Sequence, residues 1–362
     1  MCLVTECSSK ESSSSSSSSV AKNSQPSSRL TVNQPSSNVK PSSNANFGRI
    51  LANDMNVLST VSFIGWTIAG IVMALATVAF SVSFPFWLAP HAADQTYHAA
   101  FYRYDAVLSH FDNTVWTYGT DYGLAVAMTI LASRIATSRA VSRVTAWRSR
   151  GLLACYLVSV TAGGLAHQFY RTIDDQNTLT FRLLWTCCVG TVTAASGFMG
   201  AIGSELVAID QRALSLNKDL VPYVPVQFWT VFGIVTTLVC AYGGLSYQRP
   251  ACDTFIAGTT QAPSTFYVMA VLALGLPTQG VPNWARVVGV LGFILNAPLL
   301  PMYPLLVQYT DLSLAQVNTI LHSCLLLAWG MQGIALRRVC LAMERTTGPP
   351  VTAVPVKKRK EA

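Results

Sequence analysis

Residues 151–170 read Gly-Leu-Leu-Ala-Cys-Tyr-Leu-Val-Ser-Val-Thr-Ala-Gly-Gly-Leu-Ala-His-Gln-Phe-Tyr, an apolar run with one histidine near its end. About 20 apolar residues suffice for a helix to cross a hydrocarbon core of roughly 30 Å. At helical spacing, one face of this run carries Cys155, Ser159, Gly163 and His167. Small residues let a neighbouring helix approach closely. The stretch therefore predicts a packed membrane helix that ends in a buried imidazole.

The composition of the whole chain is that of a polytopic membrane protein. Of its 362 residues, 51% are hydrophobic and only 11% are charged, whereas soluble domains contain about 25% charged residues. The net charge of +8 comes from basic residues between and after apolar segments, which favours membrane topology over nucleic-acid binding. The nine cysteines show no CxxC or zinc-finger spacing, so we predict neither a disulfide scaffold nor a zinc finger.

Hydropathy and segment length predict an all-α fold of about eight transmembrane helices. The predicted membrane domain covers residues 51–338 and contains an exoplasmic loop at residues 83–118. The seventh helix contains Pro298, Pro301 and Pro304, so we expect it to be kinked or partly unwound. The predicted segments are 57–82, 120–137, 151–170, 183–208, 227–246, 255–276, 286–308 and 316–336.

Two polar tails flank the predicted membrane domain. Residues 1–50 include a serine run from Ser12 to Ser19 and are too polar to offset their ordering entropy, so we expect a disordered cytoplasmic tail. Residues 339–362 form a basic tail that ends Lys-Arg-Lys-Glu-Ala. Lys358 and Lys360 fit the Lys-x-Lys-x-x pattern of ER-retrieval signals, which the COPI coat reads. The alternative is a basic tail that lies on anionic membrane lipids.

The distribution of Lys and Arg predicts the orientation of the chain. If the N-terminus is cytoplasmic, fifteen basic residues of the connections and C-terminal tail fall on the cytoplasmic side and four on the opposite side. Cytoplasmic connections of membrane proteins carry such an excess. We therefore expect both termini in the cytoplasm and a location in the endoplasmic reticulum or Golgi. All five histidines then lie on the exoplasmic side, namely His91, His98, His110, His167 and His322.

Three predicted helices present polar groups at similar depth on that side. Asp121 opens the second helix, His167 closes the third, and His322 lies two turns into the eighth. Imidazole and carboxylate are usual zinc ligands, and three protein ligands with one open position make bound water nucleophilic. We hypothesise that His167 and His322 bind zinc and that Asp121 acts in catalysis, with Asp174 and Asp175 as further catalytic candidates. Proton relay, cation binding and simple helix packing through backbone carbonyls remain alternatives for these residues.

This pattern resembles the superfamily of alkaline ceramidases and progestin and adipoQ receptors. The superfamily pattern places an acidic residue at the start of the first span, Ser-x-x-x-His in the second, an aspartate soon after, and His-x-x-x-His in the last. Over residues 119–338, the matching positions are Asp121, Gly163-x-x-x-His167, Asp174 or Asp175, and Asn318-x-x-x-His322. The resemblance implies a zinc-dependent hydrolase of ceramide-like amides or esters. Gly163 and Asn318 depart from it, because they stand where the superfamily has serine and a zinc-binding histidine.

Other classes of membrane protein can be compared with the same residues. All seven lysines lie outside the predicted helices, which excludes a rhodopsin pigment that needs a lysine within a span. No P-loop or Rossmann glycine fingerprint occurs. A secondary transporter stays an alternative, because the proline-rich seventh helix, Asn296 and Glu205 are typical of substrate paths. A non-catalytic membrane receptor or scaffold is the other alternative.

We expect protease added to sealed microsomes to remove both tails and to leave residues 83–118 protected in the lumen, because the basic residues hold the tails in the cytoplasm. Epitope tags at the two termini and in the 83–118 segment report the outcome by immunoblotting. Microsomes opened with detergent serve as the control, in which all three tags are lost. Protection of the C-terminal tag in sealed vesicles would exclude both this orientation and the retrieval signal.

Overall fold

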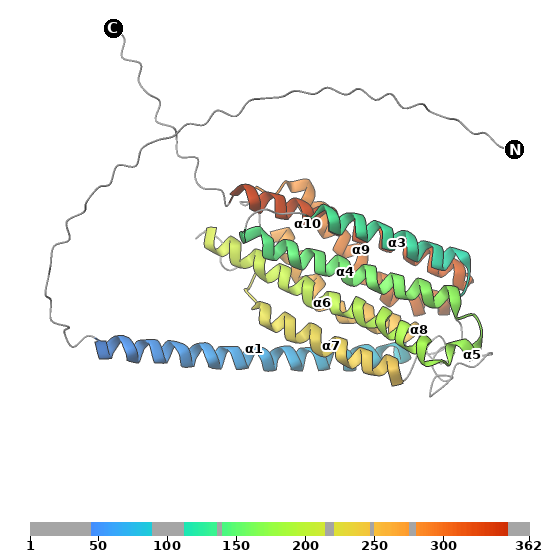
Figure 1. Cartoon of the computed structure of the whole chain (residues 1–362), viewed down its shortest axis with the longest axis horizontal. Helices are drawn as coiled ribbons and strands as arrows, with labels where there is room; N and C mark the ends of the chain where they lie inside the picture. The colour runs from blue at the N-terminus through green and yellow to red at the C-terminus, as the bar shows by residue number, and fades with distance from the viewer. Residues whose placement is uncertain are drawn as a thin grey trace, which may run out of the picture. The chain divides into compact units, whose positions relative to one another are not determined.

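The computed structural model of the chain describes residues 45–88, 112–135, 140–213, 221–246, 250–274 and 280–346. These residues form helices and no strands, which confirms the predicted all-α class. The helices are α1 (Ala45–Leu88), α3 (Val115–Arg134), α4 (Ala140–Phe169), α5 (Ile173–Gln176), α6 (Leu179–Ala213), α7 (Val226–Ser246), α8 (Pro250–Leu274), α9 (Asn283–Tyr309) and α10 (Leu314–Thr346) (Figure 1).

Each predicted membrane segment overlaps one long helix, but the helix ends differ from the predicted ones. α10 continues to Thr346, into the residues predicted as the basic tail, and α3 begins at Val115, inside the predicted exoplasmic loop. Hydropathy marks only the apolar part of a helix, whereas Glu and Arg are good helix formers that extend it into water. The Ser12–Ser19 run, the retrieval pattern and His91, His98 and His110 lie outside the described residues.

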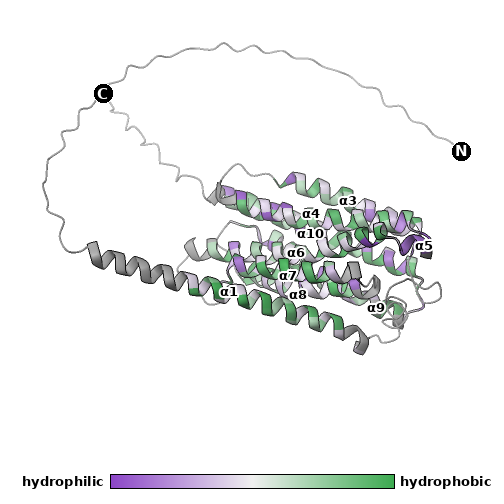
Figure 2. Ribbon diagram, turned by 60° about the horizontal axis from the view of Figure 1, so that its bottom comes forward, coloured by the Kyte–Doolittle hydropathy of each residue, from purple (hydrophilic) through white to green (hydrophobic). Residues whose placement is uncertain are grey.

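Five of the described helices are long and apolar enough to cross a membrane, and they indicate a membrane protein. Large apolar side chains on their outer surfaces support this reading, since Val61 is 63% exposed and Leu327 is 58% exposed. Figure 2 shows hydrophobic residues along α1 and hydrophilic residues at α5. The five apolar segments are Thr60–Ser83, Arg143–Phe169, Leu179–Ala208, Asn283–Tyr303 and Leu314–Glu344.

Residues Met55–Ala362 belong to one compact unit, in which six of the described helices form a closed ring. In this ring α3 packs on α4, α4 on α6, α6 on α8, α8 on α9, and α9 on α10, which returns to α3. α4 also contacts α10 across the ring, where the buried rings of Tyr156 and Trp329 stack with centroids 4.0 Å apart. α7 packs on α6 and α8 without belonging to the ring.

Proline does not interrupt α9. The helix is continuous through Pro298 and Pro301, so the predicted unwinding of the seventh helix is not observed. The facing residue on α8 is Gly258, where an added Cβ would lie 2.4 Å from the Cδ of Pro301. The missing side chain therefore leaves room for the proline ring, and α8 and α9 stay packed.

Arginine side chains stabilise one end of the ring by donating hydrogen bonds to the C-terminal carbonyls of helices. Arg150 donates to the carbonyl of Ile135 at 2.5 Å and Arg337 to that of Arg134 at 3.2 Å, both at the end of α3. Arg286 donates to the carbonyl of Ala273 at 2.6 Å, at the end of α8. The last carbonyls of a helix have no partner inside it and carry partial negative charge. These arginines therefore stabilise the bundle in addition to any role in topology.

A seam of small residues joins α6 and α7. A Cβ added at Gly233 would lie 2.7 Å from the Cα of Gly197, closer than real side chains approach. Because the obstructing atom belongs to the backbone, it cannot move aside without separating the helices. Close approach through glycine is a common way for membrane helices to gain packing contacts.

We predict that Gly233→Ala destabilises the protein by about 1–3 kcal/mol, the usual cost of overpacking a tight interface. The melting temperature of the purified protein in detergent is the measurement. Gly330→Ala in α10 is the matched control, because no described atom lies within 4 Å of a Cβ added there. Equal melting temperatures for Gly233→Ala and the wild type would show that the α6–α7 seam is not tight.

Candidate functional site

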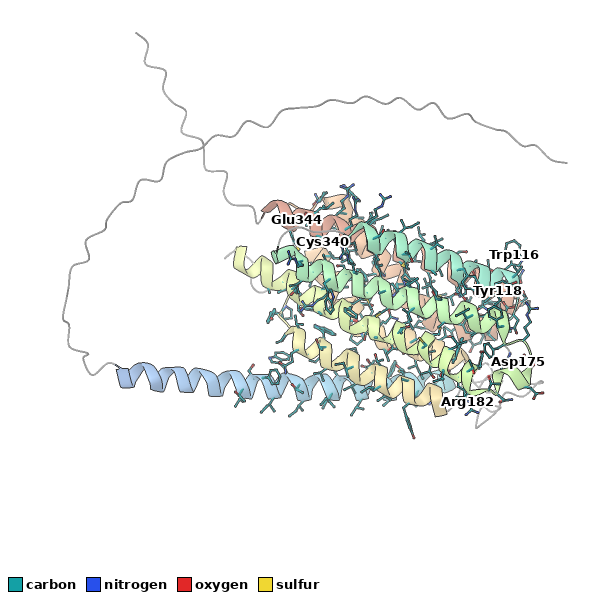
Figure 3. The ribbon with its side chains drawn as sticks, in the orientation of Figure 1. Trp116, Tyr118, Asp175, Arg182, Cys340 and Glu344 are labelled. Carbon is teal, nitrogen blue, oxygen red and sulfur yellow. The ribbon has the colours of Figure 1, made fainter. Side chains whose placement is uncertain are left out.

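The ring encloses a cavity of about 90 Å³, which has room for an ion and a few water molecules. It lies toward the end of the bundle where α3, α6, α8 and α10 begin and where α4 and α9 finish. In Figure 3, Trp116, Tyr118, Asp175 and Arg182 mark this end, whereas Cys340 and Glu344 mark the other. All six ring helices contribute lining residues, and the polar ones are Asp112, Asp121, Ser159, His167, Cys188, Thr254, Tyr303, Asn318 and His322.

Both ring nitrogens of His322 have polar neighbours. Its Nδ1 lies 2.8 Å from the hydroxyl oxygen of Thr120. That hydroxyl has a single proton and also lies 2.7–2.8 Å from two backbone carbonyls of α3. When the hydroxyl donates to a carbonyl, it accepts a hydrogen bond from Nδ1, and a neutral ring then has its lone pair on Nε2. Nε2 faces the Oδ1 of Asp121 at 3.4 Å.

Asp121 lacks the partners that a buried carboxylate requires. The residue is 3% exposed, and its Oδ2 has no hydrogen-bond partner among the described residues. Its Oδ1 lies 3.4 Å from the Nε2 of His322. An unpaired buried charge is costly, and a cation, either a proton or a metal ion, would satisfy both groups. A separation of 3.4 Å is close to that of two ligands on one tetrahedral zinc ion, about 3.4 Å for bonds of 2.0–2.2 Å.

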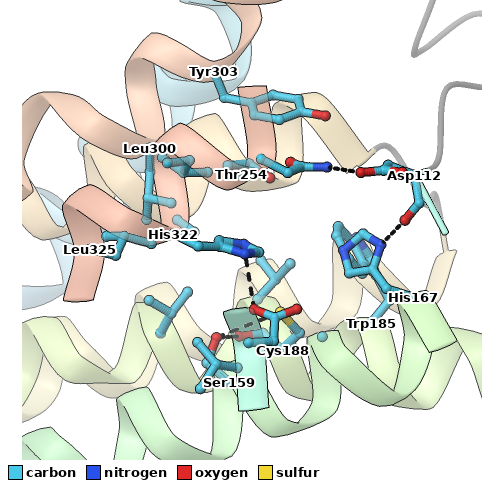
Figure 4. A pocket seen from close by; sticks show the side chains of 18 of the residues that line it. Asp112, Ser159, His167, Trp185, Cys188, Thr254, Leu300, Tyr303, His322 and Leu325 are labelled. Carbon is cyan, nitrogen blue, oxygen red and sulfur yellow. Dashed lines mark hydrogen bonds and ion pairs between the residues drawn. The ribbon is translucent and has the colours of Figure 1, made fainter. Parts of the chain in front are cut away.

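His167 faces the same cavity from α4 (Figure 4). Its Nδ1 lies 2.5 Å from the backbone oxygen of Asp112. A carbonyl only accepts, so Nδ1 carries the proton and the neutral ring has its lone pair on Nε2. The ring also packs edge-on against Trp185, whose indole nitrogen donates to Asp253 at 2.9 Å. A histidine oriented through its second nitrogen in this way is typical of metal ligands, and the same contact also serves helix packing.

Asp112, which the sequence did not single out, connects three helices of the site. Its carboxylate accepts hydrogen bonds from the Thr114 amide at 3.0 Å, from the Thr117 hydroxyl and from the Asn318 amide at 3.2 Å. Burial raises the pKa of the Asp112 carboxyl, but these hydrogen bonds together outweigh it and leave the pKa below its ordinary value. The next residue, Asn113, donates to the backbone oxygen of His167 at 2.7 Å. The segment before α3 therefore positions α3, α4 and α10 relative to one another.

Asp174 and Asp175 do not line the cavity. Asp174 is exposed, and Asp175 belongs to a capping box with Thr172 at the start of α5. Hydrogen bonds from Thr172 lower the pKa of the Asp175 carboxyl. The sequence-based interpretation grouped these two carboxylates with Asp121, but α5 lies at the rim of the bundle. Of the predicted site residues, the structure brings Asp121, His167 and His322 to one cavity.

Two kinds of site residue were missed from the sequence. Asp112 precedes Asn113 and Thr114, a pattern typical of an Asx turn before a helix, and this signal was available. Cys188 lines the cavity from α6, where its backbone oxygen accepts a hydrogen bond at 2.7 Å from Ser159, a residue that periodicity had placed on the His167 face of α4. The place of Cys188 depends on which face of α6 meets α4, and periodicity alone does not give this.

The donors of the cavity fit a metal ion in part. Among the described residues, no three His, Cys, Asp or Glu side chains come close enough together to hold a metal ion as they stand. His322 and Asp121 nevertheless have the separation of two ligands, and His167 presents a second oriented imidazole to the cavity. Asn318, at the position of the expected second histidine, instead donates to Asp112. The residues therefore present two histidines and a carboxylate to the cavity.

Comparison of the chain with protein-family models, with characterised proteins and with solved structures finds no match. The resemblance to alkaline ceramidases and progestin and adipoQ receptors therefore rests on the motif residues alone.

We predict that Asp112→Ala destabilises the protein by about 1–3 kcal/mol, because the Thr117 hydroxyl and the Asn318 amide lose a buried acceptor. The pKa of Asp112 is lowered on folding, so its contribution is complete above the unfolded pKa of about 4 and is lost as pH falls through the folded pKa. The difference in melting temperature between wild type and variant should thus shrink below about pH 4. Asp174→Ala, at an exposed carboxylate of the same end, is the control. A difference that persists unchanged in acid would contradict this role.

Proposed function

We propose that the chain is a multi-pass endomembrane hydrolase that binds one zinc ion in the cavity and cleaves the amide or ester bond of a ceramide-like membrane lipid. One observation carries the proposal: the Nε2 of His322 lies 3.4 Å from the Oδ1 of a buried carboxylate, Asp121, whose Oδ2 has no partner among the described residues. A metal cation at this place satisfies both groups. The family resemblance of Asp121, His167 and His322 points to the same chemistry.

In this proposal His167 and His322 are the nitrogen ligands. Thr120 and the carbonyl of Asp112 would each accept a hydrogen bond from the Nδ1 of one ring, so that Nε2 of each ring would be the ligating nitrogen. Zinc, when bound, would act as a Lewis acid and bring the ionisation of its water near neutral pH. Asp121 would act as a general base through Oδ2, which has no hydrogen-bond partner among the described residues.

The size of the cavity suggests how a lipid would meet these groups. A volume of about 90 Å³ holds an ion, water and the reacting bond but not an acyl chain. The apolar part of the lining includes Val189, Leu321 and Leu325. We infer that only the amide or ester bond enters the cavity, whereas the chains of the lipid stay among apolar helix surfaces or in the bilayer.

We further propose that all eight long helices cross the membrane, with both termini cytoplasmic and the cavity toward the lumen. α3, α7 and α8 are not among the five apolar segments, yet α3 and α8 complete the ring and α7 packs on α6. A helix flanked by protein needs fewer apolar residues than one surrounded by lipid. The arginines that cap α3 and α8 lie at the end opposite the cavity, as the positive-inside rule expects of the cytoplasmic end.

A secondary transporter is the second candidate, and a chain of buried polar side chains favours it. Trp329, which lines the cavity, donates to Asn296 at 2.8 Å, and Gln332 donates to the carbonyl of Gly292 at 3.2 Å one turn further along α10. Polar groups inside a membrane bundle often mark ion paths. Glu205 does not extend this chain, because it pairs with Arg148 at 2.5 Å.

The two candidates differ in metal content and in activity. We expect the purified protein to contain close to one zinc ion per chain, and we expect His167→Ala and His322→Ala each to lose it, because each variant removes a ligand. Thr120→Val keeps both rings but removes the acceptor of His322, so zinc affinity should fall by about 10–100-fold, the usual effect of such an orienting residue. Elemental analysis and release of fatty acid from a fluorescent ceramide are the measurements.

Asp174→Asn is the matched control, since its exposed carboxylate lies at the same end of the bundle outside the cavity. It should keep full zinc content and full hydrolysis. A protein that purifies without zinc, but accumulates a solute in proteoliposomes in a proton-dependent or cation-dependent manner, would replace the hydrolase by the transporter.

A further inference from the structure

A groove on the outer surface of the bundle lies over α6, between α4 and α7. Figure 1 shows α6 with α4 on one side and α7 on the other, so these two helices form the walls of the groove. Its volume is about 470 Å³, within the range of roughly 300–1,000 Å³ that is usual for small-molecule sites.

Small residues form the floor of the groove. Ala194, Gly197 and Ala201 recur every three or four residues and therefore share one face of α6. Gly233 of α7 continues this floor, since a Cβ added there would lie 2.7 Å from the Cα of Gly197. No side chain longer than a methyl group projects from these positions, so the floor is smooth.

Large apolar side chains form the rims of the groove. Trp147 of α4 packs edge-on against Phe198 of α6, with ring centroids 5.9 Å apart. Ile234 and Leu238 line the rim on α7 and are 53% and 64% exposed. Because these rims face outward, an apolar molecule can enter the groove sideways from the bilayer.

The groove follows α7 from Thr230 to Leu238. At 1.5 Å per residue this length is about 12 Å, most of one leaflet of a hydrocarbon core roughly 30 Å thick. The hydroxyls of Thr230 and Thr237 donate to backbone carbonyls of α7 at 3.0 and 2.6 Å. The groove is therefore apolar over most of its length.

Arg148 of α4 supplies a polar group at one end of the groove. Its Nη1 lies 2.5 Å from the Oε1 of Glu205, whose other oxygen accepts from Thr145 at 2.9 Å. Glu205 follows Ala201, the last lining residue of α6, by one turn. The ion pair has no net charge, and a guanidinium has more N–H donors than one carboxylate oxygen engages. This end therefore suits a neutral hydroxyl better than a phosphate, which the nearby carboxylate would repel.

We propose that the groove binds a membrane sterol, a rigid ring system with a single hydroxyl. The rings lie on the smooth floor between the apolar rims, and the hydroxyl accepts a hydrogen bond from the guanidinium of Arg148. A rigid molecule loses little conformational entropy on such a surface, whereas the acyl chain of a phospholipid must be ordered to fill it. Binding depends on neither the hydrolase nor the transporter, because no described residue lines both this groove and the cavity.

Photo-crosslinking of the wild type tests the proposal. The purified full chain is reconstituted in phosphatidylcholine vesicles with a cholesterol analogue that carries a diazirine on its rings, and mass spectrometry locates the label. We expect label on residues 194–201 and 230–238 and its loss in excess cholesterol. The 3α epimer of cholesterol has the same hydrocarbon but a displaced hydroxyl. It should compete about tenfold less well, as expected when a hydrogen bond to a charged group is lost.

A variant that fills the groove gives a second measurement. Ala194→Leu places a larger side chain on the floor, where Ala194 is partly exposed, and should remove the label from both segments. Ala76→Leu, at an exposed position of α1 outside the groove, is the matched control and should keep the label. The comparison of the two epimers uses the wild type alone, so it does not depend on the folding of Ala194→Leu.

Three results would overturn the sterol site. The first is the absence of label from both segments in the wild type. The second is equal competition by cholesterol and its 3α epimer. The third is labelling of the same segments by a photoreactive phosphatidylcholine that cholesterol does not displace, which would show a groove for bilayer lipid in general.

Discussion

A bundle surrounded by hydrocarbon must satisfy its buried polar groups from within, because lipid offers no hydrogen-bond partner. This constraint explains most of the polar contacts in the structure. The arginines at one end donate to the last carbonyls of α3 and α8, and Asn113 donates to the last carbonyls of α4 at the other end. Between the ends, Trp329, Asn296 and Gln332 pair with one another or with backbone. Against this background, the carboxylate of Asp121 is an exception that needs an explanation.

Two buried aspartates line the cavity, Asp112 and Asp121, and they differ in their hydrogen-bond partners. Asp112 accepts from Thr114, Thr117 and Asn318, and therefore serves structure by joining α3 to α10. The Oδ1 of Asp121 lies 3.4 Å from the Nε2 of His322, and its Oδ2 has no hydrogen-bond partner among the described residues. Proteins keep incompletely paired charges mainly where function uses them, and the cation site that we propose would pair this carboxylate.

The two departures from the ceramidase-like pattern also have physical explanations. Asn318 stands where the pattern has a histidine, and its amide donates to Asp112, so it stabilises the start of α3. Gly163 stands where the pattern has a serine, and a Cβ there would lie 3.3 Å from the Sγ of Cys188 and 3.6 Å from the Oδ2 of Asp121.

The sequence by itself determined the helical class and the approximate place of each long helix, because the apolar residues of a membrane segment are contiguous and hydropathy detects them directly. It also identified Asp121, His167 and His322, since ionisable residues within apolar segments are rare and stand out. It did not give the helix ends, as at α10, where good helix formers continue the backbone hydrogen bonds beyond the apolar part. Nor did it show that Asp175 caps α5 at the rim of the bundle.

Only the tertiary structure decided which side chains share the cavity. Asp112, Cys188 and Tyr303 come from three segments far apart in the chain, and no local pattern connects them. Their meeting depends on the closure of α3, α4, α6, α8, α9 and α10 into a ring and on the rotation of each helix about its axis. That rotation is set by side-chain packing between neighbours, for example Gly258 against Pro301. Because such contacts are made between distant residues, candidates for the site could be read from the sequence, and the packing of the helices selected among them.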